Sequence, residues 1–243
     1  MNYAVCCVPV APVRIEPDHR SEMISQQLFG ECCIITIAEK DGWIKIENKM
    51  DGYAGWCSRS QFQEIEEAVY NINNNKLAAD WVNEIEYKNQ LMYVPFGSLL
   101  SGIDTENIWR PSKAKKDSDM VREVAFKFLN TSYLWGGKSV FGIDCSGFTQ
   151  SVFKFLNIQL LRDAHLQATQ GELVGFLQEA RCGDLAFFDN EECDIIHVGI
   201  LLSNNQIIHA ASKVRIDKID NEGIINTETR LRTQKLRIIK RFL

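Results

Sequence analysis

The sequence lacks the features that mark membrane proteins and nucleic-acid-binding proteins. It contains no stretch of about 18 apolar residues, so we predict no membrane-spanning helix. It has no basic surplus, because 27 Lys and Arg stand against 32 Asp and Glu and give a net charge of −5. Nucleic-acid-binding domains are usually basic. It also lacks runs of like charge and internal repeats. We therefore expect a globular protein that binds neither nucleic acid nor membrane.

The N-terminus and the cysteines indicate a reducing compartment. The first residues lack the basic start of a secretory leader, and Pro9 interrupts the apolar run that follows. The eight cysteines include no Cys-x-x-Cys pair, and the four histidines have no zinc-site spacing with them. Two vicinal cysteine pairs lie in strand-like apolar runs, where we interpret them as small apolar residues. We expect a cytoplasmic protein that holds no metal ion or other cofactor.

Residues 1–65 predict a small β-domain. Short apolar runs alternate with turn signals, among them the pairs Asp41-Gly42 and Asp51-Gly52, which favour β-hairpins when apolar residues flank them. About five short strands in this length form a small barrel.

Residues 66–112 are less regular. The segments 65–75 and 76–86 have apolar spacings that fit one helix face, with an exposed Asn-rich turn at 71–75, and residues 91–95 read as a strand. We therefore predict a first domain over residues 1–112, a barrel with a helical insertion, which ends in a linker at about 103–116.

Residues 113–243 predict a second domain of the α+β class. Asp117 or Ser118 can cap a helix whose apolar residues form one stripe from Met120 to Leu129. Residues 172–180 read as helical or irregular. Later apolar segments predict strands, at residues 185–188, 195–202, 206–211, 213–216 and 236–242. Helices that precede a run of antiparallel strands are typical of α+β domains.

Cys145 stands where a nucleophile would stand. A glycine-rich segment leads to Asp144-Cys145-Ser146-Gly147, and an apolar run with helical spacing follows. Asp144 therefore reads as the N-cap and Cys145 as the first helical residue. The helix dipole and unpaired backbone N–H groups at that position favour the thiolate over the thiol. The alternative interpretation is an inert buried cysteine.

Two histidines on later strands complete a possible catalytic set. His197 would act as the general base, and His209 would orient it through the other ring nitrogen. A two-residue loop at Asn204-Asn205 would place the two rings on opposite faces, because side chains alternate along a strand. An odd loop or a bulge would instead pair Gly199 with His209 and put both rings on one face. The mechanism therefore predicts an odd loop or a bulge.

Several motifs occur in one order in the second half of the chain. Tyr-x-Trp-Gly-Gly from Tyr133 precedes Asp-Cys-Ser-Gly, and Gly183-Asp-Leu, His197-Val-Gly-Ile and His209-Ala follow. Over residues 115–243 the chain resembles the NlpC/P60 cysteine peptidases, which are papain-like enzymes that cut bacterial cell-wall peptides. The resemblance implies catalytic roles for Cys145, His197 and His209. It also implies that the Tyr133 hydroxyl joins the Cys145 N–H in holding the oxyanion, and the alternative for Tyr133 is aromatic packing.

The first domain resembles a bacterial SH3-like domain. Relatives that pair the two domains resemble dipeptidyl-peptidases that cut between γ-D-glutamate and L-lysine or meso-diaminopimelate in peptides with a free N-terminal L-alanine. This implies a set of substrate-binding residues. Asp144 would bind the ammonium group, Ser146 would hydrogen-bond the peptide backbone, and Trp135 would line the pocket. Arg162 and Asp163 match an Arg-Asp-Ser segment that contacts the D-glutamate, although alanine replaces the serine here.

The resemblance further implies that Tyr53 and Glu22 of the SH3-like domain close the groove, and ordinary surface positions are the alternative for both. Three other functions remain open. The first is an endopeptidase that acts on intact peptidoglycan, with the SH3-like domain as a wall-binding module. The second is an acyltransferase or amidase on the same scaffold, and the third is a non-catalytic binding module. The choice between L-lysine and diaminopimelate remains open as well.

Overall fold

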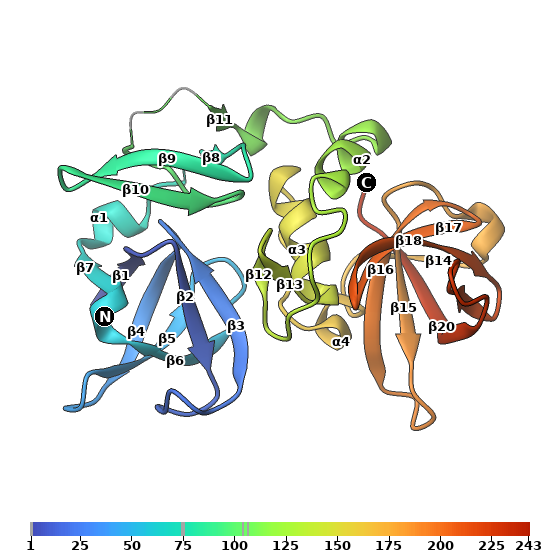
Figure 1. Ribbon diagram of the computed structural model, residues 1–243, viewed down its shortest axis with the longest axis horizontal. Helices are drawn as coiled ribbons and strands as arrows, with labels where there is room; N and C mark the ends of the chain where they lie inside the picture. Colours follow the sequence, from blue (N-terminus) through green and yellow to red (C-terminus); the bar gives the residue numbers. More distant parts are fainter. Residues whose placement is uncertain (1, 74–75, 104, 106) are drawn as a thin grey trace. The chain divides into compact units, whose positions relative to one another are not determined.

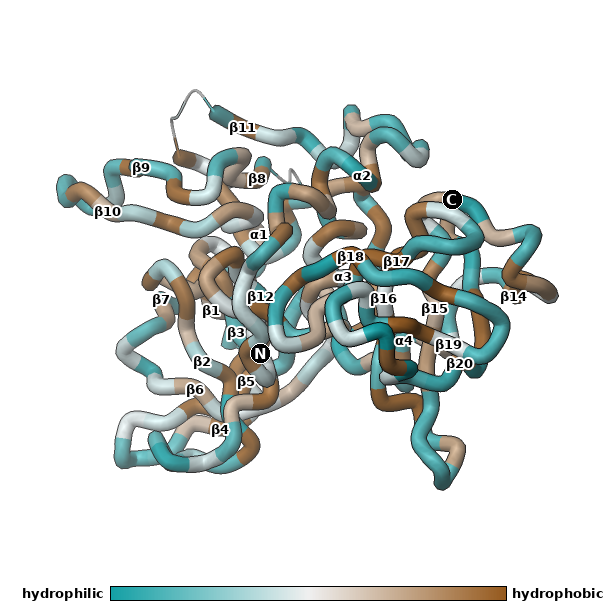
Figure 2. The backbone as a smooth tube through the Cα atoms, turned by 45° about the vertical axis from the view of Figure 1, so that its right-hand side comes forward, coloured by the Kyte–Doolittle hydropathy of each residue, from teal (hydrophilic) through white to brown (hydrophobic). Residues whose placement is uncertain are grey.

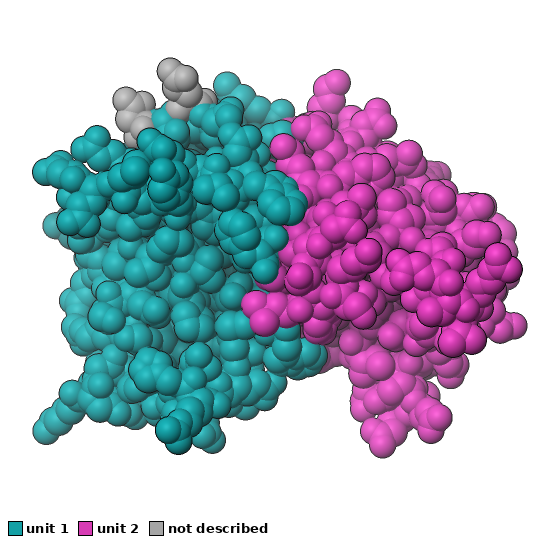
Figure 3. Space-filling view, viewed as in Figure 1, with its two compact units in different colours: residues 1–113, 135–141 teal, residues 114–134, 142–243 magenta. Residues whose placement is uncertain are grey.

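The computed structural model describes residues 2–73, 76–103, 105 and 107–243. The chain divides into two compact units, which Figure 3 colours separately. Unit 1 comprises residues 1–113 together with 135–141, and unit 2 comprises 114–134 and 142–243. The division therefore differs from two continuous domains over 1–112 and 113–243, because the segment 135–141 packs within unit 1.

Unit 1 is built on an antiparallel sheet of seven strands, in the order β3-β2-β6-β5-β4-β1-β7 (blue to cyan in Figure 1). The strands are β1 (Asn2–Cys6), β2 (Val10–Arg14), β3 (Met23–Leu28), β4 (Cys32–Ala38), β5 (Trp43–Asn48), β6 (Ala54–Ser58) and β7 (Phe62–Ile65). The core residues are Ala4, Val13, Cys33, Ile44, Ile46 and Cys57. The prediction of a β-rich N-terminal region is confirmed, and Cys33 and Cys57 pack as apolar side chains.

The predicted helical insertion is wrong for most of its length. After the single turn α1 (Glu67–Tyr70) come four strands: β8 (Leu77–Ala78), β9 (Val82–Tyr87), β10 (Gln90–Pro95) and β11 (Ile108–Trp109). In β9, buried Asn83 and Ile85 alternate with exposed neighbours, which is the period of a strand. Lys88 and Asn89 take φ values of 53° and 58°, which suit a two-residue hairpin turn. Parts of the predicted turn at 71–75 and linker at 103–116 lie outside the described residues.

The helices of unit 2 begin where the sequence predicted. In α2 (Ser118–Phe126) the Asp117 side chain accepts a hydrogen bond from the N–H of Met120, and Val121, Val124 and Ala125 are buried. Helix α3 (Cys145–Phe155) is buried over almost all of its length. Helix α4 (Ala164–Gln167) is a single turn. The two longer helices are therefore confirmed, because N-caps and apolar stripes are local signals.

Most of the rest of unit 2 is a closed ring of strands (orange to red in Figure 1). It contains β15 (Leu185–Asp189), β16 (Ile195–Ser203), β17 (Gln206–Ala211), β18 (Lys213–Asp220), β19 (Gly223–Ile225) and β20 (Arg232–Arg241). Pairing of β19 with β20 closes the ring, and β14 (Glu172–Val174) adds to β20. The core takes a side chain from every ring strand, namely Ala186, Phe188, Leu201, Ile207, Ile219, Ile224 and Ile239.

Two details of unit 2 differ from the predicted pattern. Strand β19 was not predicted, and the segment 172–180 contains β14 and a 3-10 turn at Leu177–Glu179 rather than an α-helix.

The loop from β15 to β16 is hydrophilic, as the teal tube in Figure 2 shows. Across the described part of the chain, no helix combines the length and the apolar character needed to cross a membrane.

Candidate active site

Cys145 is the first residue of α3, as predicted. Asp144 caps the helix with extended backbone angles (φ −92°, ψ 178°), and its carboxylate accepts a hydrogen bond of 2.6 Å from the Gly147 N–H. The Cys145 thiol therefore lies at the N-terminal end of the helix. The first backbone N–H groups there have no hydrogen-bond partner within the helix. Cys145 is only 6% exposed.

Burial, rather than the helix start, controls the protonation of this thiol. Loss of water raises the pKa of Cys145 to about 12, and the negative charge of Asp144 adds to the effect. Hydrogen bonds from the backbone N–H groups of Val198 and Ser146, and the charge of Arg162, oppose it without reversing it. The direction of this pKa shift runs against the predicted thiolate, because burial favours the neutral thiol. The same two N–H groups stabilise the sulfur once its proton has left.

A β-bulge places the two histidines on one face, as the mechanism required. At the hairpin end Ser203 pairs with Gln206, but Leu201 pairs with Ile207 and Ile200 with Ile208, because the register shifts between Leu201 and Ser203. Continued by one residue, this register sets Gly199 opposite His209. A Cβ on Gly199 would lie 2.8 Å from the His209 Cβ, so only glycine leaves room there. The predicted bulge is confirmed.

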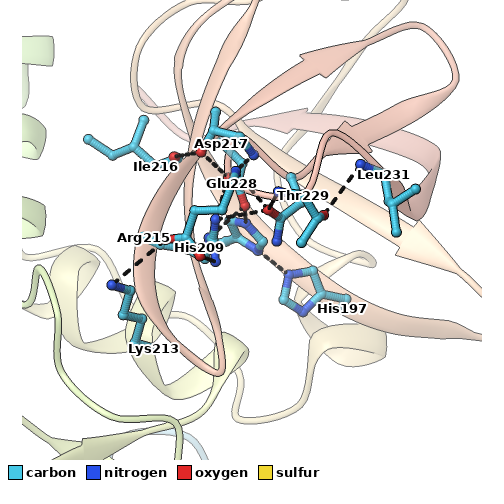
Figure 4. A network of polar contacts seen from close by, with 11 residues as sticks. His197, His209, Lys213, Arg215, Ile216, Asp217, Glu228, Thr229 and Leu231 are labelled. Carbon is cyan, nitrogen blue, oxygen red and sulfur yellow. Dashed lines mark hydrogen bonds and ion pairs between the residues drawn. The ribbon is translucent and has the colours of Figure 1, made fainter.

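The two imidazole rings are in direct contact. His197 Nε2 lies 2.8 Å from His209 Nδ1, and the residues are 6% and 1% exposed. Figure 4 shows the two rings pointing toward one another. Burial, together with the nearby His209, lowers the pKa of His197 well below its usual range, so its ring is neutral. Since Nε2 engages His209, Nδ1 is the nitrogen left to take a proton.

Asp217 lies behind His209, and no motif of the sequence predicted it there. Its Oδ2 lies 3.1 Å from His209 Nε2, on the side of the ring away from His197. Burial opposes ionisation of Asp217, but hydrogen bonds from His209, Thr227 and Arg215 outweigh it and lower the pKa of the carboxyl. His209 pairs with Arg215 across β17 and β18, so Asp217 is a diagonal neighbour on the same face. That strand spacing is the signal that could have identified it.

Tyr133 is half-buried in unit 2, and its N–H donates to the Ser212 carbonyl at 2.9 Å. Burial raises the pKa of its hydroxyl, and negative charge on Cys145 and Asp144 raises it further. The phenol therefore stays protonated and keeps its O–H for donation. Its role as an oxyanion donor stays a prediction.

Arg162 is brought to Asp144 across 18 positions of sequence. Its guanidinium is 1% exposed and pairs with both oxygens of Asp144, with Nη2–Oδ2 at 2.6 Å and Nη1–Oδ1 at 3.1 Å. Nη1 also lies 3.0 Å from the Ser146 hydroxyl. Asp163 is half-buried and precedes α4 without a capping hydrogen bond from its side chain. Gln167, not predicted, donates to the Ser146 carbonyl at 3.0 Å. Three of the predicted substrate residues thus form one buried polar cluster beside the nucleophile.

The remaining predicted substrate residues belong to unit 1. The indole Nε1 of Trp135 donates to the Glu22 carboxylate at 2.6 Å, which joins two residues 113 positions apart. Both side chains are exposed. Tyr53 is half-buried just before β6, and its N–H donates to the Asp51 side chain. Within the described residues, no group of three His, Cys, Asp or Glu side chains could hold a metal ion.

A buried thiol at a helix start, a neutral imidazole oriented by a second one, and N–H groups directed at the sulfur are the parts of a cysteine peptidase. The chain belongs to the NlpC/P60 family, whose sequence profile matches residues 130–233. A second profile, the bacterial dipeptidyl-peptidase Sh3 domain, matches residues 13–62.

Similar proteins cover both units of the chain. A gamma-D-glutamyl-L-lysine dipeptidyl-peptidase of Bacillus subtilis is 33% identical over 215 residues, which are 76% of this chain and 71% of that protein. Dipeptidyl-peptidase 6 of Lysinibacillus sphaericus is 22% identical over 90% of this chain and 92% of its own length. The crystal structure of an NlpC/P60 family protein from Bacillus cereus matches with a TM-score of 0.81 at 19% identity, over 99% of each chain.

Proposed function

We propose that this protein is a cytoplasmic dipeptidyl-peptidase that recycles cell-wall peptides. It hydrolyses the bond between γ-D-glutamate and L-lysine or meso-diaminopimelate in peptides with a free N-terminal L-alanine. The observation that carries the proposal is the similarity to gamma-D-glutamyl-L-lysine dipeptidyl-peptidases, which extends over most of the chain and not only over the catalytic unit. The substrate is thus a small soluble peptide, and neither nucleic acid nor membrane is a partner.

The chemistry begins with two neutral groups. His197 Nδ1 accepts the thiol proton as Cys145 Sγ attacks the γ-carbonyl, and charge develops on the carbonyl oxygen. The Cys145 N–H and the Tyr133 hydroxyl donate to that oxygen. The imidazolium then protonates the leaving amine, and a thioester to Cys145 remains. Water, deprotonated by His197, attacks the thioester and releases L-Ala-D-Glu.

Specificity for a free amine requires a carboxylate near the nucleophile. Asp144 supplies it, and the paired Arg162 and Ser146 hold it in one orientation. Glu22 of unit 1 stays a second predicted substrate-binding residue. Trp135 orients Glu22 through its indole N–H. Tyr53 and Asp163 complete the proposed substrate set.

The test compares L-Ala-γ-D-Glu-L-Lys, its diaminopimelate analogue and N-acetylated forms of both. We expect release of L-Ala-D-Glu from the free-amine peptides, at least about 100-fold faster than from the acetylated ones, because an ammonium–carboxylate contact is lost in the latter. Cys145→Ala is the control and should leave no turnover. Equal cleavage of the acetylated peptides would reject the proposal.

The alternative is an endopeptidase on intact peptidoglycan, with the SH3-like domain as a wall-binding module. A Listeria seeligeri protein named as a probable endopeptidase p60 is 41% identical, but over 41% of this chain and 19% of that protein. Because the match covers only part of each chain, it favours a shared catalytic chemistry rather than a shared substrate. Cleavage of purified sacculi at a rate matching that of the free peptides would favour the alternative.

A further inference from the structure

The carboxylate of Asp217 lies beside His209, on the side away from His197, and its two oxygens have different hydrogen-bond partners. Asp217 is 1% exposed. Its Oδ1 accepts from the N–H and the hydroxyl of Thr227, both at 2.8 Å, and from Arg215 Nη2 at 3.1 Å. Its Oδ2 faces His209 Nε2 at 3.1 Å, and Arg215 Nε makes an ion-pair contact of 2.8 Å with it. Oδ1 thus accepts three hydrogen bonds, and Oδ2 is the oxygen that meets the ring.

A carboxylate can only accept hydrogen bonds, which settles the proton positions on both rings. His209 must carry its proton on Nε2 in order to donate to Asp217. Its Nδ1 is then bare and accepts from His197 Nε2–H across 2.8 Å. His197 in turn has a bare Nδ1. A neutral imidazole in this tautomer is the form that can take the proton of the Cys145 thiol.

We propose that Asp217 is a positioning residue of the active site: by accepting from His209 it fixes the tautomers of both histidines and leaves His197 Nδ1 free to deprotonate Cys145. The inference deepens the proposed peptidase function and rests on its chemistry. It extends the set Cys145–His197–His209 by a residue that touches neither the substrate nor the sulfur. Arg215 and Thr227 hold the carboxylate in the orientation that this role needs.

Asp217→Asn tests the proposal with almost no change in shape. Three hydrogen-bond donors point at the Oδ1 position, whereas the Arg215 Nε contact with Oδ2 is an ion pair without a hydrogen bond. We therefore expect the asparagine oxygen at the Oδ1 position and the amide NH2 in place of Oδ2. The amide then donates to His209 Nε2. This shifts the His209 proton to Nδ1 and the His197 proton to Nδ1 as well, which blocks the nitrogen that the thiol needs.

The direct measurement is the tautomer of each ring, by ¹⁵N NMR of protein labelled at its four histidines. For the wild-type protein we expect Nε2–H on both His197 and His209. For Asp217→Asn we expect Nδ1–H on both. A wild-type His209 that carries its proton on Nδ1 overturns the proposal even if the variant fails to fold.

Kinetics supply the second measurement. We expect kcat for the tripeptide to fall by about 100-fold or more in Asp217→Asn, as a wrong histidine tautomer does in serine proteases, with KM unchanged. Asp220→Asn on the same strand is the matched control, because Asp220 is an exposed partner of Arg232, and its kcat should equal that of the wild type. An unchanged kcat in Asp217→Asn contradicts the proposal.

The tautomer measurement needs no substrate, so it separates this inference from the proposed function. If the wild-type protein shows both expected tautomers but does not cleave the tripeptide, the proposed substrate is wrong and the role of Asp217 stands. If it cleaves the tripeptide but the tautomers do not change in Asp217→Asn, the role of Asp217 is wrong and the function stands.

Discussion

Burial is the dominant influence on the single residues of the active site. A helix N-terminus stabilises an anion by about 0.3–1 kcal/mol. Raising the pKa of Cys145 to about 12 corresponds to about 4 kcal/mol in the opposite direction. Burial therefore favours a thiol and a neutral imidazole, and in the proposed mechanism the base takes the proton during the attack. The hydrogen-bond chain that we propose behind His197 acts at this step.

The first prediction concerns the thiol without its base. In His197→Ala we expect the rate of Cys145 alkylation by iodoacetamide to rise about tenfold per pH unit from pH 7 to pH 9, because the thiolate fraction grows that way below the pKa. Mass spectrometry of the peptide that contains Cys145 gives the rate, with exposed Cys193 as the internal reference. A plateau below pH 9 would indicate a low-pKa thiol instead.

The second prediction concerns acid stability. The folded protein lowers the pKa of Asp217, so its ionised form stabilises the fold. That contribution is complete above the unfolded pKa of about 3.9, and it is lost as the pH falls through the folded value. We expect the wild type to be more stable than Asp217→Asn at pH 7, and the difference to shrink below about pH 4. Urea unfolding at pH 7, 5, 4 and 3 measures it, and a difference that does not depend on pH contradicts the prediction.

At the level of the individual strands, the pairing register decides on which face of the sheet a side chain lies. One extra residue in β16 moves the register before the hairpin by one position, and this places His197 and His209 on the same side of the sheet. The hairpin of β9 and β10 shows the same effect: Val82 and Ile85, which the sequence placed on one helix face, lie in a strand in which Val82 is exposed and Ile85 is buried. In both cases the pairing partner, and not the local propensity, determines the outcome.

The third prediction tests this register. Gly199→Ala places a Cβ 2.8 Å from the His209 Cβ and 2.8 Å from Ile207 Cδ1. We expect a loss of about 1–3 kcal/mol of unfolding free energy from overpacking and a lower kcat, because His209 must shift. Gly175→Ala is the control, since the nearest atom to its Cβ would be 3.8 Å away. Wild-type kcat in Gly199→Ala would show that the ring does not depend on this space.

In the molecule as a whole, a segment of the catalytic half of the sequence belongs to the SH3-like unit. Within unit 1, Lys138 pairs with Glu31 at 3.4 Å across 107 positions of sequence, and the residues are 5% and 0% exposed. The Lys138 N–H also donates to the Gln26 side chain at 2.8 Å. Together with the Trp135–Glu22 hydrogen bond, these contacts tie residues 135–141 to the sheet of unit 1.

The fourth prediction tests this ion pair. Glu31→Gln removes a negative charge that is paired with a buried ammonium, and such a change typically costs about 3–5 kcal/mol of unfolding free energy. The double variant Glu31→Gln/Lys138→Met should recover most of the loss, because it removes the buried ammonium while the glutamine oxygen still accepts from the Leu28 N–H. Glu64→Ala is the control, since its ion pair with Arg59 is exposed and worth about 0–1 kcal/mol. Urea unfolding measures all three variants, and a loss for Glu31→Gln as small as for Glu64→Ala would contradict the prediction.

The sequence by itself determined the helix starts and predicted Cys145, His197 and His209 as the catalytic residues. A capping carboxylate, an apolar stripe and a motif in fixed order are local features, and they need no knowledge of distant neighbours. Only the tertiary structure decided the protonation of the thiol, the place of Asp217 behind His209 and the membership of residues 135–141 in unit 1. Desolvation and cross-strand contacts arise when distant segments pack together, so no local pattern in the chain carries them.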